Sequence, residues 1–461
     1  MLKASFSIDY KKILLQVKMS FPNTMTDTAQ LYAYFLQCSE VSTDTRQIKP
    51  ETLFFALKGA NFNGNQFAKN ALEKGAKYAV IDEPFYKTSD QFILVEDCLK
   101  ALQNLANWHR NTFSFPFLAI TGTNGKTTTK ELVSAVLSTH FKTKATQGNL
   151  NNHIGVPLTL LGIKKEHQIA VIEMGANRIG DIHELVGIAE PNFGIITNIG
   201  QAHLEGFGSY EGVLRAKSEL YDHLLKKGGT AFINATNPVL QNMGKRFERS
   251  QEAKMVYYGI PDSFYHAELL AADPYISYKN EAGEVINTQL LGTYNFDNIL
   301  SALCVAKYFG VEMHLAHQAI ANYSPSNNRS QVIKGELNTL ILDAYNANPS
   351  SMKAALENFS KMPAPNKTVI LGDMFELGKF SLEKHREIAQ IALDMDFKNV
   401  FFCGKDFFKI RGEVKTNKNT YFFETKEDLK NQLQAHKLSN AYLLIKGSRG
   451  MGLESLVEFV K

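Results

Sequence analysis

Residues 121–129 (TGTNGKTTT) constrain the fold of this chain most, because a Gly-Lys-Thr turn follows directly after an apolar run. The run at 117–121 reads as a buried strand, and residues 126–140 carry a helical pattern. A strand, a glycine turn and a helix in this order are typical of a phosphate-binding loop, where backbone N–H groups and a helix N-terminus meet phosphate oxygens. We therefore expect an α/β domain that binds a nucleotide.

The residue types in this loop predict its chemistry. Gly122 and Gly125 allow tight turns, Lys126 would reach the β- and γ-phosphates, and the Thr127 hydroxyl would bind Mg²⁺. The fit to the general G-x-x-x-x-G-K-[ST] pattern is incomplete, because Ile120 stands five positions before Gly125, so the loop is a short variant. An ordinary glycine-rich turn is the alternative interpretation. The predicted nucleotide-binding residues of the loop are Gly122, Thr123, Asn124, Gly125, Lys126, Thr127 and Thr128.

The length of 461 residues leaves room for about three domains of roughly 150 residues each. Turn-rich segments at 112–116 (TFSFP) and 323–328 (YSPSNN) divide the chain into residues 1–113, 114–324 and 325–461. Strand and helix patterns alternate throughout, which predicts an α/β protein with largely parallel sheets. We expect a small N-terminal α/β domain, a central parallel-sheet ATPase domain with the phosphate loop, and a C-terminal Rossmann-like domain.

Short apolar runs and helical spacing locate the expected elements, and Thr26 or Asp27 is expected to cap the first helix. The expected strands lie at 53–57, 78–81, 92–95, 117–121, 169–173, 194–198, 230–234, 339–344, 368–371, 400–403 and 442–445. The expected helices lie at 28–37, 65–74, 126–140, 179–189, 210–225, 297–309, 350–359, 382–393, 426–436 and 453–460.

Composition excludes several classes of protein. The four cysteines form no C-x-x-C pair, which disfavours a cysteine metal site and fits free thiols in a reducing cytoplasm. No run approaches the roughly 18 apolar residues of a membrane span. The net charge of +4 is dispersed rather than clustered, so nucleic-acid binding has no support. We expect a cytoplasmic monomer.

Polar side chains follow two of the expected strands, at the sheet edge where open α/β folds bind ligands. Glu173 ends the strand at 169–173 and would suit Mg²⁺ beside the phosphate loop, and His203 lies just beyond the next strand. For either side chain taken alone, a solvated or merely hydrogen-bonded role is favoured, whereas their shared placement at strand ends favours the magnesium role. Lys217, on the helix at 210–225, would from composition alone be a surface lysine.

Five segments of the chain occur together in one enzyme family. They are 121–129, 149–157 (NLNNHIGVP), 173–176 (EMGA), 198–205 (NIGQAHLE) and 446–449 (KGSR). Together they resemble the Mur ligases, the ATP-dependent amide-forming enzymes of peptidoglycan precursor synthesis. The resemblance runs from about Val41 to the end, in the three-domain order of the family. It implies ATP, two Mg²⁺ ions and an acyl-phosphate intermediate.

Four further segments narrow the resemblance to one branch. They are 41–46 (VSTDTR), 53–59 (LFFALKG), 343–349 (DAYNANP) and 371–378 (LGDMFELG). They resemble the members that join D-alanyl-D-alanine to UDP-N-acetylmuramoyl-tripeptide, so these compounds are the implied partners. The member that adds the third amino acid usually carries Asp-Asn-Pro-Arg, which does not occur in this chain.

The resemblance also assigns roles residue by residue. Thr127, Glu173 and His203 match magnesium positions, and Lys217 matches a lysine that is carbamylated in the family and helps to hold a second Mg²⁺. The implied catalytic residues are Lys126, Lys217 and His203. The implied nucleotide contacts outside the loop are Asn295 and Asn298 near adenine, with Arg329 and Asp343 at the phosphates and ribose. The implied substrate contacts are Ser42, Asp44, Thr45 and Arg46 for the UDP-sugar, Asn151 and Asn152 for the muramoyl part, and Tyr345, Asn346 and Asn348 for the dipeptide.

Two departures from the family pattern stand out. Tyr294 occupies a position where the family usually has His, on the adenine side. Residues 1–24 have no counterpart, and the recognisable helix begins near Thr26, so Met19 or Met25 is the expected start.

Three other interpretations fit the sequence less well. Folylpolyglutamate synthetases share the loop and the acyl-phosphate logic but typically lack an N-terminal UDP-sugar domain, so residues 41–110 disfavour them. A P-loop switch or motor holds Mg²⁺ with a strand that ends in Asp, whereas the matching strand here ends in Glu173. A catalytically dead scaffold would not need Lys126, Glu173, His203 and Lys217 together.

Overall fold

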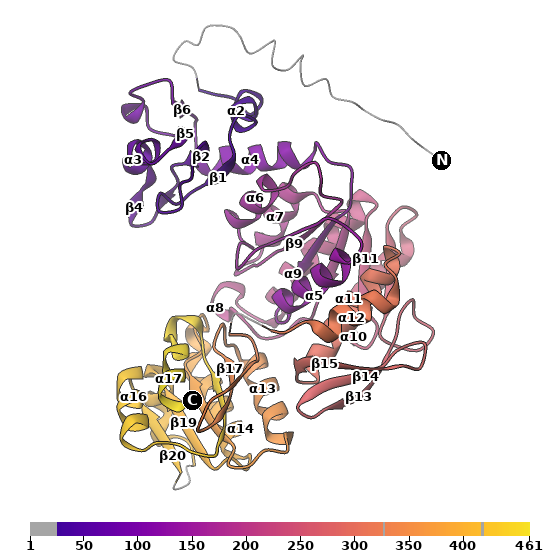
Figure 1. The fold of residues 1–461 in the computed structure, drawn as a ribbon, viewed down its shortest axis with the longest axis vertical. Helices are drawn as coiled ribbons and strands as arrows, with labels where there is room; N and C mark the ends of the chain where they lie inside the picture. The colour runs from indigo at the N-terminus through magenta and orange to yellow at the C-terminus, as the bar shows by residue number, and fades with distance from the viewer. Residues whose placement is uncertain (1–24, 326–327, 416–418) are drawn as a thin grey trace. The chain divides into compact units, whose positions relative to one another are not determined.

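The computed structural model describes residues 25–325, 328–415 and 419–461 (Figure 1). Its backbone divides into two compact units. Among the described residues, the first comprises 25–117, 144–174 and 184–191, and the second comprises 118–143, 175–183, 192–325, 328–415 and 419–461. The expected start at Met19 lies outside the described residues, as do positions 326 and 327 of the second expected linker.

A four-stranded sheet with the order β1-β2-β5-β6 forms the N-terminal part, and its paired strands are parallel. Asp27 caps the first helix as predicted, because its carboxylate accepts the N–H of Gln30, whose side chain accepts the N–H of Asp27 in return. Helix α4 was not predicted. Its buried face mixes Leu102 and Leu105 with polar Arg110, whose guanidinium donates to backbone carbonyl oxygens. The elements are α2 (Thr28–Phe35), β1 (Glu40–Ser42), β2 (Thr52–Phe55), β3 (Lys58–Gly59), β4 (Phe62–Asn63), η1 (Gly64–Phe67), α3 (Ala68–Glu73), β5 (Ala76–Ile81), η2 (Pro84–Tyr86), β6 (Phe92–Leu94) and α4 (Cys98–Arg110).

A six-stranded sheet with the order β12-β11-β10-β7-β9-β8 carries the phosphate loop. Strands β7, β9 and β11 are buried over all five residues and coincide with the predicted ranges, since continuous apolar runs are typical of strands covered on both faces. The pairs from β7 through β10 and β11 to β12 are parallel, so their carboxyl ends share one edge. The elements are β7 (Phe117–Thr121), α5 (Lys126–Ser138), β8 (Thr143–Ala145), α6 (Gly155–Leu161), β9 (Ile169–Glu173), α7 (Asp181–Ala189), β10 (Phe193–Ile196), α8 (Leu204–Phe207), α9 (Tyr210–Lys227), β11 (Thr230–Asn234), α10 (Pro238–Gly244), η3 (Lys245–Arg249) and β12 (Lys254–Tyr258).

An antiparallel three-stranded sheet, β13-β14-β15, was not predicted. Its first strand is mostly exposed and its apolar residues do not alternate regularly, so the period-two signal of a half-buried strand is absent there. The elements are β13 (Glu268–Ala272), β14 (Tyr275–Lys279), β15 (Val285–Leu291), α11 (Tyr294–Tyr308) and α12 (Met313–Asn322).

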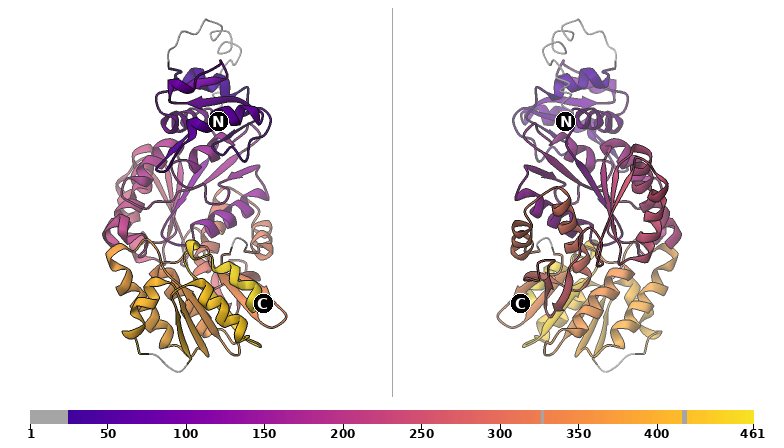
Figure 2. Two further views of the ribbon diagram at one scale, coloured as in Figure 1. Left: turned by 90° about the vertical axis from the view of Figure 1, so that its left-hand side faces the viewer. Right: turned by 90° about the vertical axis from the view of Figure 1, so that its right-hand side faces the viewer.

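The C-terminal part is a mixed six-stranded sheet with the order β16-β17-β21-β18-β19-β20, in which β16 alone runs antiparallel to its neighbour. Helices α13 and α14 cover one face and α16 and α17 cover the other, each with its own apolar core (Figure 2). The helix predicted at 453–460 is two short pieces, η7 and α17. The elements are β16 (Gln331–Lys334), β17 (Thr339–Asp343), α13 (Pro349–Lys361), β18 (Thr368–Gly372), η4 (Gly378–Phe380), α14 (Ser381–Leu393), β19 (Asn399–Cys403), α15 (Lys405–Lys409), η5 (Ile410–Gly412), β20 (Thr420–Phe423), α16 (Lys426–Ala435), β21 (Tyr442–Lys446), η6 (Arg449–Met451), η7 (Leu453–Leu456) and α17 (Val457–Val460).

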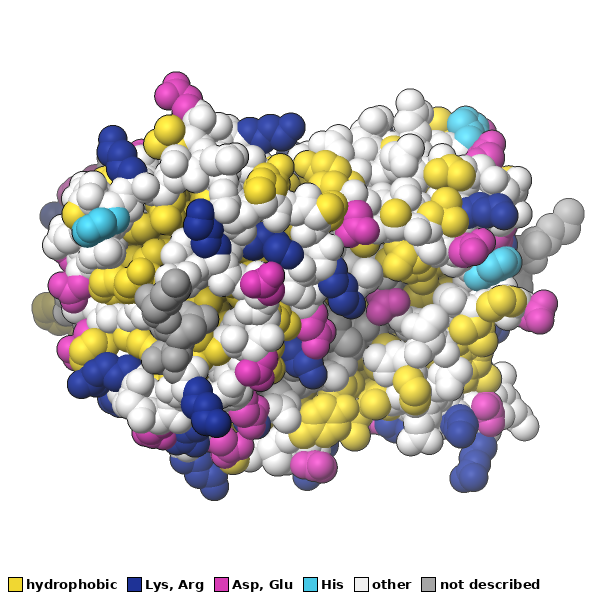
Figure 3. Space-filling model, turned by 90° about the horizontal axis from the view of Figure 1, so that it is seen from below, with side chains coloured by type: hydrophobic (Ala, Val, Ile, Leu, Met, Phe, Trp, Pro, Cys, Tyr) yellow, Lys and Arg dark blue, Asp and Glu magenta, His cyan; other side chains and the backbone are white. Residues whose placement is uncertain are grey.

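The surface carries charges of both signs (Figure 3), and the four cysteines are free thiols. None of the described helices is both long enough and apolar enough to cross a bilayer. Basic and acidic side chains are interspersed on the face seen in Figure 3. Cys98, Cys304 and Cys403 are buried free thiols whose pKa burial raises, so they pack as small apolar groups.

Candidate active site

The phosphate loop joins β7 to α5, and two glycines with positive φ shape it. Gly122 has a φ of +142° and Gly125 a φ of +77°, and Gly125 stands directly before the first helical residue, Lys126. The first N–H groups of α5 therefore open toward the loop, as in an anion site at a helix N-terminus. The Lys126 ammonium donates to the carbonyl oxygens of Gly122 and Thr123, both at 2.8 Å, so the lysine lies over its own loop.

Two residues that follow β10 hold the loop in place. Asn198 Oδ1 accepts the N–H of Asn124 at 2.9 Å, and the Asn198 carbonyl oxygen accepts the N–H of Thr123 at 2.9 Å. The Thr197 hydroxyl donates to the carbonyl oxygen of Asn124 at 2.6 Å. Neither Thr197 nor Asn198 carries a predicted role, although Asn198 opens the NIGQAHLE segment.

Asn295 and Asn298, predicted to lie near adenine, are buried against the phosphate-loop helix. The Thr129 hydroxyl donates to Asn298 Oδ1 at 2.9 Å, and Asn298 Nδ2 donates to Asn295 Oδ1 at 2.8 Å. A methyl group added at Gly125 would lie 2.6 Å from Asn298 Oδ1. Asn298 therefore supports the tightest turn of the loop.

Glu173 ends β9, which neighbours β7 on the side opposite β10. Its side chain is buried, its Oε1 accepts Asn151 Nδ2 at 2.7 Å, and its N–H donates to Thr146 Oγ1 at 3.0 Å. Asn152 Oδ1 accepts N–H groups at the start of α6, which is a structural role. A buried carboxylate is an oxygen donor of the kind Mg²⁺ prefers, and so is the hydroxyl of Thr127, so the chemistry of each side chain by itself suits magnesium.

Lys217 lies on α9 and is only 2% exposed, although composition alone would place it on the surface. Burial, and then the positive charge of Lys126, lower the pKa of Lys217 well below its usual range, while Asp181 and Glu219 oppose the shift. A lysine in this environment favours the neutral amine. His203 adopts a φ of +49° just before α8 and pairs with the Glu376 carboxylate, which lowers the pKa of Glu376.

Asp343 and Lys446 form a buried ion pair at adjacent strand ends of the C-terminal sheet. Lys446 Nζ lies 2.6 Å from Asp343 Oδ2 and 3.2 Å from the carbonyl oxygen of Asn346, and its side chain is 2% exposed. The Arg329 guanidinium stacks on Tyr345, with Cζ 3.8 Å from the ring centroid. The predicted contacts Arg329, Asp343, Tyr345 and Asn346 thus gather at one edge of this sheet.

Asn348 and Tyr294 have structural partners. Asn348 Oδ1 accepts the N–H of Ser351 as the cap of α13, and its Nδ2 donates to Asn124 Oδ1 at 2.8 Å. The Tyr294 hydroxyl lies 2.9 Å from the Ser330 hydroxyl, and burial raises the pKa of Tyr294. The tyrosine at position 294 is therefore partly buried, and its hydroxyl has a hydrogen-bond partner in the Ser330 side chain.

Models of one protein family match most of this chain. The Mur ligase middle domain matches residues 120–306, the Mur ligase, glutamate ligase domain matches residues 328–449, and the Mur ligase family, catalytic domain matches residues 37–110. The chain belongs to the Mur ligase family.

This Mur ligase is similar to known members over nearly its whole length. It is 33% identical over 428 residues to a UDP-N-acetylmuramoyl-tripeptide–D-alanyl-D-alanine ligase of Bacillus subtilis (strain 168), covering 91% of this chain and 92% of the relative. A crystal structure of MurF from Acinetobacter baumannii matches with a TM-score of 0.80 at 30% identity, covering 91% and 92%. MurF ligase from Thermotoga maritima in complex with ADP matches with a TM-score of 0.78 at 26% identity, covering 92% and 97%. The predicted three-domain α/β fold class is confirmed, with a mixed C-terminal sheet.

The N-terminal loop of this Mur ligase, predicted to meet a UDP-sugar, is held by its own side chains. Arg46 Nη2 lies 2.7 Å from Asp44 Oδ2, and hydrogen bonds from Arg46 lower the pKa of Asp44 to about 2. The Ser42 hydroxyl donates to the carbonyl oxygen of Asp44 at 3.1 Å, and the Thr45 carbonyl oxygen accepts Lys74 Nζ at 3.0 Å. The Arg46 side chain is 85% exposed, and its Nε and Nη2 both donate to the Asp44 carboxylate.

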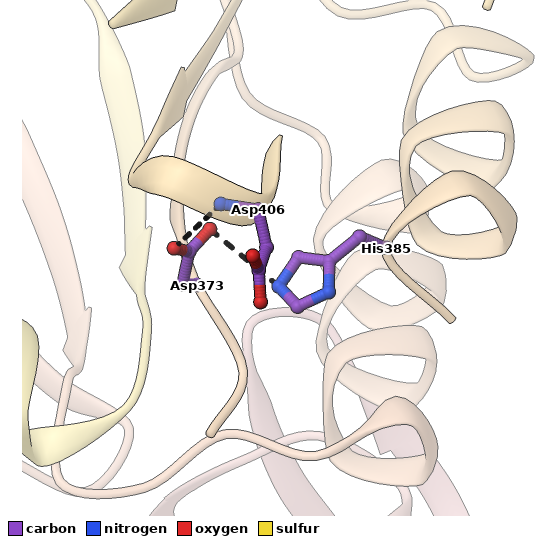
Figure 4. A group of neighbouring side chains, drawn as sticks. All are labelled: Asp373, His385 and Asp406. Carbon is purple, nitrogen blue, oxygen red and sulfur yellow. Dashed lines mark hydrogen bonds and ion pairs between the residues drawn. The ribbon is translucent and has the colours of Figure 1, made fainter. Parts of the chain in front are cut away.

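A cluster of Asp373, His385 and Asp406 lies beyond β18 (Figure 4). Its acceptors are already engaged: the Asp373 carboxylate accepts the N–H groups of Asp406 and Phe407 at 3.0 Å each, and His385 Nε2 accepts the N–H of Met374 at 3.0 Å. Burial raises the pKa of Asp373. The cluster therefore fixes the loop after β18 to the start of α15, and it does not suit a metal ion.

The predicted residues fall in both compact units. The second unit holds the phosphate loop, Lys217 beside Lys126, His203, the two asparagines of α11 and all the predicted C-terminal contacts. The first unit holds the loop at 42–46, both asparagines of the muramoyl loop, and Glu173. No role was predicted for Thr197 and Asn198, because uncharged polar residues after a strand are common in loops of every kind and carry no distinctive sequence signal.

Proposed function

We propose that this chain joins D-alanyl-D-alanine to UDP-N-acetylmuramoyl-tripeptide with ATP, giving UDP-N-acetylmuramoyl-pentapeptide, ADP and phosphate in peptidoglycan synthesis. The observation that carries this proposal is the similarity, over 91% of this chain, to a relative with that activity in its name. The glycine-shaped phosphate loop with Lys126 and the buried Lys217 support it, because both belong to the chemistry of that reaction.

The reaction needs an activated carboxylate, because a free carboxylate anion repels nucleophiles. Transfer of the γ-phosphoryl group of ATP to the tripeptide carboxylate gives an acyl phosphate with a good leaving group. The dipeptide amine then attacks the carbonyl carbon, phosphate leaves with the C–O bonding pair, and the amine loses a proton. Lys126 and Arg329 would neutralise charge on the phosphoryl group, while the N–H groups of the loop orient it.

Thr127, Glu173 and His203 are the proposed magnesium ligands. When bound, Mg²⁺ would screen the negative charge of the phosphates and the carboxylate. We infer that Lys217 is carbamylated, because CO₂ adds only to a neutral amine, which the burial of Lys217 favours. The carbamate would supply two further oxygen donors for a second Mg²⁺.

The remaining proposed roles come from the family resemblance. Asn295 and Asn298 support the loop on the adenine side, and Arg329 and Asp343 present charged groups for phosphate and ribose from the C-terminal domain. Further proposed contacts are Ser42, Asp44, Thr45 and Arg46 for the UDP-sugar, Asn151 and Asn152 for the muramoyl part, and Tyr345, Asn346 and Asn348 for the dipeptide.

The proposal is tested by an amide-formation assay with the purified chain, ATP, D-alanyl-D-alanine and tripeptide substrates with diaminopimelate or lysine at the third position. Phosphate release should require both the UDP-linked substrate and the dipeptide. Lys126→Ala should abolish release, whereas Lys69→Ala, a change at a lysine whose side chain is 81% exposed, should not. Release of phosphate from ATP alone would identify a hydrolase or switch instead.

A further inference from the structure

Three loops leave one edge of the C-terminal sheet from neighbouring strands. β17, β21 and β18 lie side by side and parallel, so their carboxyl ends share that edge. After β17 and β18 the chain turns to α13 and α14 on one face, and after β21 it turns to α17 on the other (Figure 2). Neighbouring strands whose connections leave to opposite faces of the sheet create a crevice between them, and open α/β sheets bind ligands in such a crevice. Tyr345, Phe375 and Arg449 lie on these loops, one on each.

Arg449 presents an exposed guanidinium at this edge. Its Cζ lies 5.2 Å from the centroid of the Tyr345 ring, within the roughly 6 Å over which a cation and an aromatic face attract each other. Within residues 328–415 and 419–461, no acidic side chain forms an ion pair with Arg449. This approach to a ring on which the Arg329 guanidinium also stacks, at 3.8 Å, restrains the Arg449 guanidinium and leaves its N–H groups available for an anion. Lys446, which ends β21, is already neutralised by Asp343.

Phe375 provides an apolar surface beside Arg449. Its side chain is 45% exposed, and its ring lies so close to Gly450 that a methyl group there would be 2.6 Å from Cε2. The backbone beneath is fixed, because the Phe375 N–H donates to Ser448 Oγ at 2.9 Å and the preceding residue is held by His385. An aromatic ring that stays half exposed on a rigid loop is suited to contact a small apolar group.

We propose that Arg449, supported by Tyr345 and Phe375, binds the carboxylate of the incoming dipeptide. This inference rests on the proposed function, in which D-alanyl-D-alanine brings one amine, two methyl groups and one carboxylate. A guanidinium matches a carboxylate through two parallel hydrogen bonds, and the methyl groups suit the ring of Phe375. The amine, at the far end of the dipeptide, is left for the acyl phosphate. Arg449 is thus a specificity residue for the nucleophile.

The test compares D-alanyl-D-alanine with D-alanyl-D-alaninamide, which keeps the amine and both methyl groups but lacks the carboxylate. For the unaltered enzyme we expect kcat/KM to be about 10- to 100-fold higher with the free acid, the worth of a charge-assisted hydrogen-bonded pair. In Arg449→Ala the ratio of kcat/KM for the acid to kcat/KM for the amide should fall to about one, because kcat/KM falls for the acid and does not change for the amide. KM for ATP and for the UDP-linked substrate should not change. Phe375→Ala should raise KM for both dipeptides alike.

Arg411→Ala is the matched control, because Arg411 also stacks on an aromatic ring of this domain, with Cζ 4.1 Å from the centroid of Phe408. It should keep the full preference for the acid. Arg449→Lys should retain part of the preference, since a single ammonium replaces a planar fork. An unchanged preference in Arg449→Ala, or equal losses with both dipeptides together with a raised KM for ATP, would overturn the inference and assign Arg449 to the nucleotide. If the unaltered enzyme ligates neither dipeptide, the proposed function itself fails.

Discussion

Gly125→Ala is the substitution whose cost the structure defines most closely. Gly125 has a φ of +77°, and the left-handed conformation costs a residue with a side chain about 1–2 kcal/mol. The new methyl group would lie 2.6 Å from Asn298 Oδ1, a distance that real contacts do not reach. Asn298 is buried and must move, so its bond from the Thr129 hydroxyl at 2.9 Å is lost or stretched. Leaving such a buried pair unsatisfied costs roughly 1–3 kcal/mol.

These terms add to about 2–5 kcal/mol. This free-energy loss can appear in two measurements. If the phosphate loop keeps its strained conformation, the free energy of unfolding falls. If the loop relaxes to another conformation, the affinity for ADP falls, because ADP binding must restore the original conformation. We would measure the free energy of unfolding in urea and the affinity for ADP by calorimetry, and add the two losses. Gly310→Ala is the control, because its φ is +76° and no atom lies within 4 Å of the added methyl group.

Gly310→Ala should therefore cost about 1–2 kcal/mol, all of it in stability. In a chain that already carries Asn298→Ala, the obstructing oxygen is gone, so Gly125→Ala should cost no more than Gly310→Ala. Equal summed losses for the two glycine variants, or a penalty at Gly125 that survives Asn298→Ala, would refute the reasoning.

Three further perturbations test other parts of the molecule. Lys217→Met should abolish amide formation while ADP binding persists. After incubation with ¹³C-bicarbonate, a carbamate signal should appear in the ¹³C NMR spectrum of the unaltered chain and not in that of the variant. A carbamate signal in both spectra would contradict the assignment. Asp343→Ala leaves the buried Lys446 without its partner at 2.6 Å and should lower the free energy of unfolding by roughly 3–5 kcal/mol, whereas Asp343→Ala with Lys446→Met should recover much of that loss in urea titrations. Burial lowers the pKa of His109 and His317, so below about pH 6.5 the unfolded chain binds protons that the folded chain does not. The free energy of unfolding should therefore fall as the pH falls from there toward the folded pKa values. Replacing both histidines by Gln should flatten this part of the profile of unfolding free energy against pH.

Local patterns were enough to predict four strands of the central sheet, β7, β9, β10 and β11, whereas β8 and β12 were not predicted. β7, β9 and β11 coincide with predicted runs because a strand buried on both faces is continuously apolar. The phosphate loop could likewise be located, since its glycines and its lysine act within a few residues of one another. Elements that are exposed or that bury polar groups were missed, as with β13 and α4, because their signal depends on partners distant in sequence.

The sequence by itself determined the buried strands β7, β9 and β11, the glycine turn at Gly125 and the family motifs, because each is encoded within a short window. Tertiary structure decided what the charged and polar residues do. Lys217 is buried rather than on the surface, and Lys446 pairs with Asp343, 103 residues away. The insertion of β21 between β17 and β18 brings Arg449 to Tyr345. The physical reason is that burial and charge pairing depend on strand order and crossover, which no local spacing of residues specifies.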